Sequence, residues 1–111
     1  MLWLWLFACE GDEGARQEEE DAAYAAGCDE GQVAGTVSGA DDGKACRAQS
    51  DVPLETARKG MLKYCGGKTD VDAEVPCYWW EIGYLDCWRA GYDMSYPVAW
   101  DEAGCEADSG S

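Results

Sequence analysis

The chain has no His, so its main candidates for chemistry are its seven cysteines and 23 acidic side chains. Without His there is no Ser-His-Asp or Cys-His catalysis and no imidazole metal ligand. No Cys-x-x-Cys pair occurs, which excludes the thioredoxin-like redox motif, zinc ribbons and c-type haem attachment. Disulfide formation is therefore the expected role of the cysteines. Their number is odd, so one cysteine is left without a partner.

Cys9 is the odd cysteine, and it directly follows an apolar segment. Residues 2–8 read Leu-Trp-Leu-Trp-Leu-Phe-Ala, which is too short to span a bilayer but fits the apolar core of a secretory signal. Leu6-Phe7-Ala8-Cys9 resembles the bacterial lipobox, in which the Cys is acylated and becomes the first residue of the mature chain. The resemblance implies lipidation of Cys9 and a membrane anchor. The alternative is an exposed apolar tail or a short retained anchor.

The other six cysteines predict three structural disulfides. Six thiols in about 100 residues suit an oxidising compartment, and each bridge adds about 2–4 kcal/mol to a domain with few large aliphatic residues. A cysteine-only metal site is the rival, but it needs close ligand pairs. Fifteen pairings are possible, and the spacing does not choose among them. The six are Cys28, Cys46, Cys65, Cys77, Cys87 and Cys105.

One group of acids has the spacing of a calcium loop. Asp70, Asp72, Glu74 and Glu81 occupy positions 1, 3, 5 and 12 of such a loop. Val75 replaces the Gly that makes its sharp turn, so alternating solvated acids are the preferred interpretation. We expect no cofactor and no other metal site. We also expect no enzyme, because so small a chain has little room to hold a catalytic acid pair in a cleft.

The net charge excludes a further class of function. Eight basic residues against 23 acidic ones give a formal charge of −15. Such a surface repels nucleic acid backbones and anionic lipid headgroups. We therefore expect no nucleic acid partner.

The elements that must position these residues begin with a row of glycines at every fourth position. Residues four apart lie above one another on a helix, so the row predicts a helix with a groove free of side chains. Val33 and Val37 lie nearly opposite the row, so such a helix is contacted on two sides. A strand over 31–39 remains open, because this segment is partly β-branched. The row consists of Gly27, Gly31, Gly35, Gly39 and Gly43.

A second helix is predicted over 54–64, with Ser50, Asp51 and Pro53 as turn and cap residues and Cys65-Gly66-Gly67 as its stop. A third is predicted from about Tyr78 to Ser95, because Pro97 disfavours a further turn. Its aromatic ridge fits the glycine groove and would form the core. The ridge consists of Trp80, Tyr84, Trp88, Tyr92, Tyr96 and Trp100, with a row of small residues beside it that includes Gly83 and Gly91.

The pattern Gly83-Tyr84-x-x-Cys87-x-x-x-Gly91-Tyr92, together with the earlier glycine row, resembles the Gly-Tyr-x-x-Gly helical repeats of small bacterial lipoproteins. It also resembles the Gly-x-x-x repeats of some helical adaptor proteins. The resemblance implies a compact helical hairpin and no catalytic residues.

These observations predict a mainly α fold, either a small disulfide-stapled helical hairpin or a three-helix domain. We expect a signal segment (1–8), an acidic tether (9–20), the folded domain (21–105) and a flexible tail (106–111). The function expected is that of an exported, lipid-anchored structural or adaptor protein of the bacterial envelope, in the periplasm or at the cell surface. It would act through a protein partner or self-assembly. The alternatives are a carbohydrate- or peptide-binding module using Tyr78-Trp79-Trp80, and an accessory subunit of an extracellular assembly or enzyme.

Overall fold

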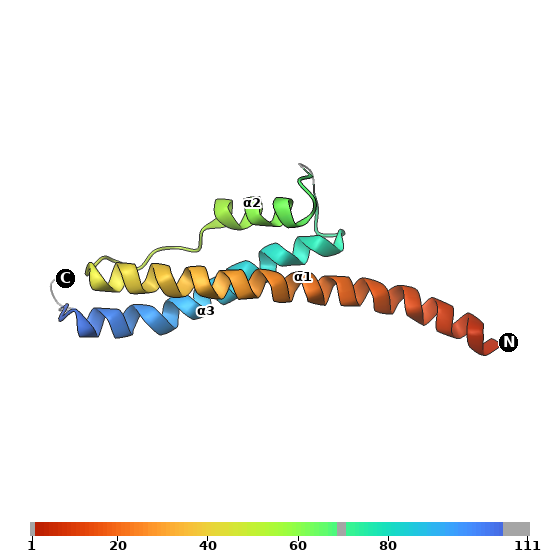
Figure 1. The fold of residues 1–111 in the computed structure, drawn as a ribbon, viewed down its shortest axis with the longest axis horizontal. Helices are drawn as coiled ribbons and strands as arrows, with labels where there is room; N and C mark the ends of the chain where they lie inside the picture. Colours follow the sequence, from red (N-terminus) through yellow and green to blue (C-terminus); the bar gives the residue numbers. More distant parts are fainter. Residues whose placement is uncertain (1, 69–70, 106–111) are drawn as a thin grey trace.

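The computed structural model describes residues 2–68 and 71–105, with side chains from residue 14 onward. This part of the chain is helical and contains no strand. Its elements are α1 (Leu2–Lys44), α2 (Leu54–Tyr64), the 3₁₀ turn η1 (Pro76–Tyr78) and α3 (Trp79–Glu102) (Figure 1). The predicted mainly α, disulfide-stapled domain is confirmed.

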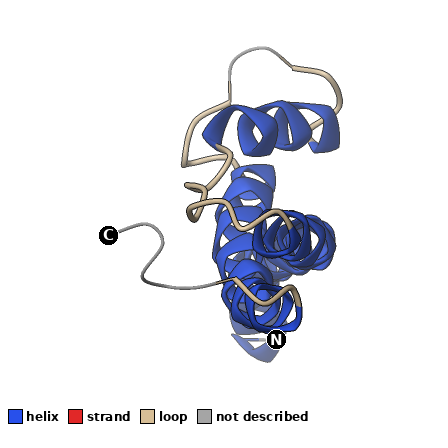
Figure 2. Cartoon of the chain, turned by 90° about the vertical axis from the view of Figure 1, so that its left-hand side faces the viewer, coloured by secondary structure: helices blue, strands red, loops and turns tan. Residues whose placement is uncertain are grey.

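The two long helices α1 and α3 lie side by side and run in the same direction (Figure 1). Gly27 of α1 lies at Trp80 of α3, Gly35 at Trp88 and Gly43 at Tyr96, so residue numbers rise together along both helices. Parallel neighbours need a return connection, which α2 and its flanking loops supply. α2 lies over one side of the pair (Figure 2). The three-helix form of the prediction therefore holds, and the hairpin form does not.

α1 is one helix across both segments that the sequence left in doubt. Residues 31–39 are helical, so the strand alternative is wrong. The predicted tether over 9–20 is also helical, and its described residues 14–19 are exposed. It lacks an apolar period, but Ala, Arg, Gln and Glu are good helix formers. Local pairs also support the helix: the Arg16 side chain lies 3.6 Å from Glu20, and the Gln17 amide donates to Asp21 at 2.9 Å.

α2 has the predicted bounds, but its predicted cap does not form. Pro53 is at the N-cap and no side chain caps the helix, because the Ser50 hydroxyl instead donates to Asp42 at 2.7 Å. The predicted stop is confirmed. Gly66 and Gly67 have φ values of +94° and +80°, a region that only glycine enters without strain.

α3 continues through Pro97 to Glu102, two turns beyond the predicted end. A proline inside a helix removes one hydrogen bond and costs about 3 kcal/mol. Packing beyond it offsets that cost. Ala99 and the backbone of Trp100 lie against Gly43 of α1, and the Cys46–Cys105 disulfide joins the ends of both helices. Here tertiary contacts outweigh a local preference.

The core lies between the helix pair and α2. The predicted aromatic ridge of α3 supplies most of it, as expected for a chain poor in large aliphatic residues. Ala57 and Met61 of α2 cover the ridge from above and are fully buried. The buried rings are Trp80, Tyr84, Trp88, Tyr92 and Tyr96.

Candidate functional site

The glycine row of α1 forms a contact between two helix backbones. A Cβ built on Gly35 would overlap the carbonyl oxygen of Trp88 and lie 2.8 Å from its Cα. A Cβ on Gly31 would meet the backbone of Tyr84 in the same way. Real Cβ atoms do not approach backbone this closely. The groove predicted from the sequence is therefore real, but the backbone of α3 fills it rather than the aromatic rings.

The contact is reciprocal. A Cβ on Gly83 of α3 would overlap the Tyr24 carbonyl, and one on Gly91 would lie 2.6 Å from the Gln32 carbonyl oxygen and 2.7 Å from the Thr36 hydroxyl. Small residues on both helices thus permit the close approach. The predicted fit of the aromatic ridge into the glycine groove is therefore wrong, because the small residues of both helices face each other and bring their backbones together.

The rings themselves stack along α3, on the side that α2 and the 45–53 connection cover. Trp80 stacks on Tyr84 with centroids 5.1 Å apart, and Trp88 stacks on Tyr92 at 4.9 Å. The Trp80 ring also lies directly beneath Gly60 of α2, where a Cβ would overlap it. The aromatic ridge of α3 therefore determines the position of α2.

Six cysteines pair as Cys28–Cys87, Cys46–Cys105 and Cys65–Cys77, with Cα atoms 4.9, 5.6 and 5.5 Å apart. The first two join α1 to α3, each across 59 residues of sequence, and the third closes a short loop between α2 and η1. The predicted use of all six is confirmed. Three disulfides in so small a chain indicate an oxidising, extracellular-type environment.

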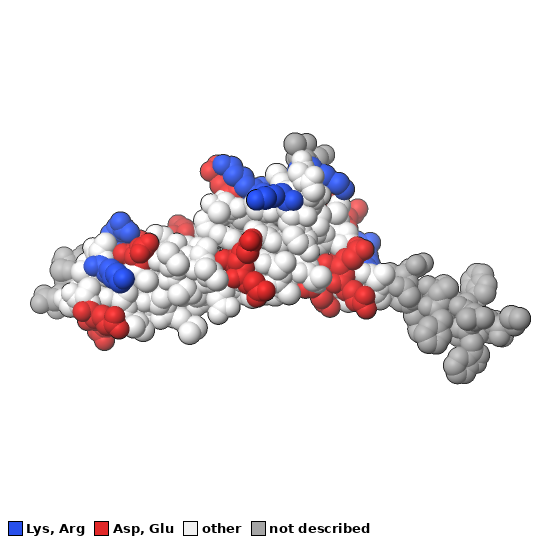
Figure 3. All heavy atoms as spheres, viewed as in Figure 1, with Lys and Arg blue, Asp and Glu red and all other residues white. Residues whose placement is uncertain are grey.

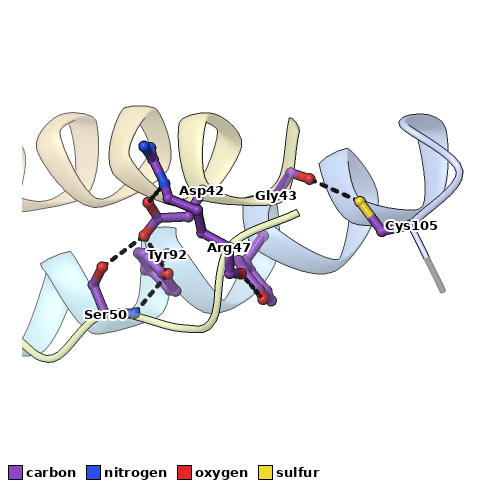
Figure 4. A network of polar contacts seen from close by, with 7 residues as sticks. Asp42, Gly43, Arg47, Ser50, Tyr92 and Cys105 are labelled. Carbon is purple, nitrogen blue, oxygen red and sulfur yellow. Dashed lines mark hydrogen bonds and ion pairs between the residues drawn. The ribbon is translucent and has the colours of Figure 1, made fainter. Parts of the chain in front are cut away.

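A buried carboxylate connects both long helices to the connection between them (Figure 4). Asp42 of α1 accepts hydrogen bonds from the Tyr92 hydroxyl at 2.6 Å and from the Ser50 hydroxyl at 2.7 Å. The Arg47 guanidinium donates to its other oxygen at 3.0 Å. The Tyr92 hydroxyl in turn accepts from the Ser50 backbone N–H at 2.8 Å. No local pattern in the sequence predicts this network, because Ser50 and Asp42 lie 42 and 50 residues before Tyr92.

The network sets the direction of two pKa values. Hydrogen bonds from Tyr92, Ser50 and Arg47 lower the pKa of Asp42 below its ordinary value. Burial, and then the hydrogen bond to Asp42, raise the pKa of Tyr92. Both shifts favour the state in which Asp42 is ionised and Tyr92 is protonated.

Stability should therefore fall in acid through Asp42. Its contribution is fully present above the unfolded pKa of about 3.9 and is lost as the pH falls through the lower folded pKa. Asp42→Asn should cost about 2 kcal/mol at neutral pH and flatten the acid side of the stability profile. Urea unfolding between pH 7 and pH 2 measures both effects. The matched control is Asp41→Asn, at an exposed neighbour. An equal change in both variants would contradict the assignment of this acid-dependent stability to Asp42.

A second buried carboxylate accounts for one of the calcium-loop residues. Glu81 is buried, and both its oxygens accept from Arg58 Nε, at 2.7 and 3.1 Å. Asp72 accepts the Glu74 backbone N–H in a local turn at 3.0 Å, and Asp70 lies outside the described residues. No three acids or cysteines in the described part of the chain are placed to hold a metal ion.

Two other predicted sites have mixed outcomes. Of the Tyr78-Trp79-Trp80 platform, Trp80 is buried in the core, while Tyr78 and Trp79 are partly exposed. Cys9 lies within the bounds of α1, but its side chain is outside the described part of the structure. The helices, as far as they are described, contain no stretch long and apolar enough to cross a bilayer.

The exposed surface of the helix pair carries an uncharged patch, which the sequence did not reveal as one surface. Residues 31–40 contain no charged residue, nor do residues 94–100, and Gly39 packs on Ser95 between them. Figure 3 shows an uncharged stretch between groups of acidic side chains. We define the uncharged patch as the exposed residues Gln32, Val33, Thr36, Val37, Met94 and Val98.

The patch is apolar as well as uncharged. Val33 is 66% exposed, Val37 54%, Met94 72% and Val98 56%. Thr36 joins its two halves, because it lies against Gly91, one turn before Met94. The second contact side that the sequence predicted for Val33 and Val37 is therefore absent within the described part of the chain.

These features define the protein as a small disulfide-bonded helical domain built on a parallel, glycine-mediated helix pair. No protein-family model, curated protein or solved structure matches the chain.

Proposed function

We propose that this chain is an exported structural or adaptor protein, which binds another protein or a second copy of itself through the uncharged patch. The observation that carries the proposal is the exposure of four large apolar side chains on a chain of net charge −15. Contiguous exposed apolar surface is typical of interaction sites. The proposal assigns the chain no catalytic reaction.

The distribution of charge on the surface supports the uncharged patch as the position of the interface. Carboxylates dominate the rest of the surface and repel other acidic proteins. The patch lets a partner's apolar side chains approach without desolvating a charge, which would cost several kcal/mol. The rigid helix pair beneath it, joined by two disulfides, presents the patch without a further ordering cost.

The disulfides and Cys9 support the location we propose. Three bridges fit an oxidising compartment, and the lipobox-like residues before Cys9 fit lipid attachment there. The exposed helical segment over 14–19 would then hold the domain away from the membrane. We propose anchoring in the bacterial envelope, in the periplasm or at the cell surface, with an extracellular assembly or enzyme as one kind of partner.

The carbohydrate- or peptide-binding alternative is weaker on this geometry. Trp80 lies beneath Gly60 and is 4% exposed, so the platform loses its central ring. Trp79 lines a small groove of 160 Å³ beside Tyr24.

Site-specific photo-crosslinking in the native cell tests the interface. A benzoylphenylalanine probe at Val37 and another at Met94 should give the same discrete adduct, because the two positions share one patch on different helices. The matched control is a probe at Thr56, which is exposed on α2 and should give none. Twice the chain mass would identify a second copy, and any other discrete mass a different protein. Equal adducts from all three probes would contradict the patch as the interface.

The intact mass of the natively expressed protein tests export separately. Loss of residues 1–8, added lipid on Cys9 and six alkylatable thiols after reduction are expected. An uncleaved chain with free thiols before reduction would contradict export.

A further inference from the structure

We propose that a groove beside Tyr96 and Trp100 binds an organic cation, a primary ammonium or guanidinium group on an apolar stem. The groove lies between α3 and the connection that follows α1, and its volume is 790 Å³. It is separate from the uncharged patch and does not rest on the proposed function. Its lining consists of Gln49, Asp93, Tyr96, Pro97, Trp100 and Asp101.

The chain already holds two of its own cations in the arrangement we propose. The Arg58 guanidinium lies 5.9 Å from the centroid of the Tyr78 ring, with Nε 2.7 Å from Glu81. The Arg89 guanidinium lies 5.8 Å from the Trp88 centroid and 3.6 Å from Asp93. Each is a cation on an aromatic face beside a carboxylate, within the range of cation–π attraction.

The groove repeats the same combination one turn further along α3. The Tyr96 ring is buried between Tyr92, at 5.4 Å, and Trp100, at 5.7 Å, so the partly exposed Trp100 ring supplies the face for a cation. Asp93 and Asp101 stand on either side of these rings in the sequence.

The lining of the groove contains the carboxylates of Asp93 and Asp101. The Arg89 guanidinium lies 3.6 Å from Asp93, so of the two only Asp101 has no ion-pair partner in the described part of the chain. Ring faces and carboxylates are both electronegative, so the lining favours a cation over an anion or a neutral sugar.

Pro97 forms an apolar part of the same wall. An ammonium offers three donors and a guanidinium five, enough to satisfy the Asp101 carboxylate and the Gln49 amide oxygen together. An apolar stem would then pack against Pro97 and the Trp100 ring.

Two sources share this chemistry: a free alkyl amine, and a Lys or Arg side chain of another protein. Both would present the same charged group and stem. The experiment therefore uses n-butylammonium for the first and N-acetyl-lysine N-methylamide for the second, with butan-1-ol as a neutral control.

Indole N–H signals in a ¹H–¹⁵N spectrum of the full oxidised chain report the binding. Trp100→Phe identifies the Trp100 signal. At constant ionic strength, each cation should shift this signal saturably, and butan-1-ol should not. The Trp79 signal, at the opposite end of α3, should not move. Asp93→Asn with Asp101→Asn should weaken binding about tenfold. Both sites are exposed, and the Arg89–Asp93 ion pair that the first change removes lies at the surface and contributes little to stability, so the fold is retained.

The matched control is Glu18→Gln with Glu19→Gln, which removes the same charge from an exposed segment of α1 and should leave affinity unchanged. Tighter binding of the blocked lysine would assign a protein side chain, and equal or tighter binding of n-butylammonium a free amine; either supports the cation site. Linear shifts, equal shifts of all indoles, or equal losses in both double variants would overturn it.

Discussion

Gly35→Ala should destabilise the protein by about 3 kcal/mol, although alanine is the better helix former. The new methyl group would overlap the Trp88 carbonyl oxygen and lie 2.7 Å from its carbonyl carbon. Backbone cannot rotate away as a side chain can, so α1 and α3 must separate along their length. Urea unfolding of the oxidised protein measures the loss.

Gly14→Ala is the matched control on the same helix. A Cβ at Gly14 meets nothing within 4 Å, so only the helix propensity changes, and stability should rise by up to about 1 kcal/mol. The two substitutions are chemically identical, and their effects should have opposite signs. A loss of less than about 0.5 kcal/mol for Gly35→Ala would contradict the backbone contact between the helices.

Replacing both Cys28 and Cys87 by Ser should cost about 4 kcal/mol, as should removing Cys46–Cys105, because each of these bridges closes 59 residues of sequence. Cys65–Cys77 closes only 12. In the chain-entropy account the shorter loop is worth about 3 kcal/mol. Comparing the first double variant with one that lacks Cys65–Cys77 by urea unfolding tests that order. Greater destabilisation on removing Cys65–Cys77 would show that the short loop constrains the native packing of α2.

The pairing itself is checked by proteolysis of the oxidised protein and mass spectrometry. Linked peptides containing Cys28 with Cys87 and Cys46 with Cys105 are expected. Linked peptides joining Cys28 to Cys105 and Cys46 to Cys87 would contradict the parallel arrangement of α1 and α3, because the end of each helix would then lie beside an earlier part of the other.

Much of the fold could be predicted from the sequence where a pattern repeats along one element. The glycine row, the aromatic row and the stop at Gly66-Gly67 were each visible, because helical periodicity and backbone conformational freedom are local properties. Prediction failed where local signals competed with packing or with each other. Pro97 ended the predicted helix early, and the absence of an apolar period hid a helix over 9–20.

The candidate sites were less predictable, because their members come from different elements. In the sequence, Asp42 is simply one of two adjacent acids. Only the fold brings Tyr92 and Ser50 into contact with it. Glu81 fits a calcium loop by spacing, yet it pairs with Arg58 of α2. Val33 and Val37 were expected to be contacted, and the described chain leaves them exposed beside Met94. The local spacing of these residues does not determine which distant residue each of them contacts.

By itself, the sequence determined the class of the molecule: a small acidic helical domain with six cysteines to pair and small residues aligned for close helix contact. These follow from composition and period, which act residue by residue along the chain. Only the tertiary structure decided the parallel direction of α1 and α3, the choice among fifteen disulfide pairings, and the separation of a covered aromatic side from the exposed uncharged patch. Those outcomes depend on which faces meet, and that is set by the combined packing of all three helices.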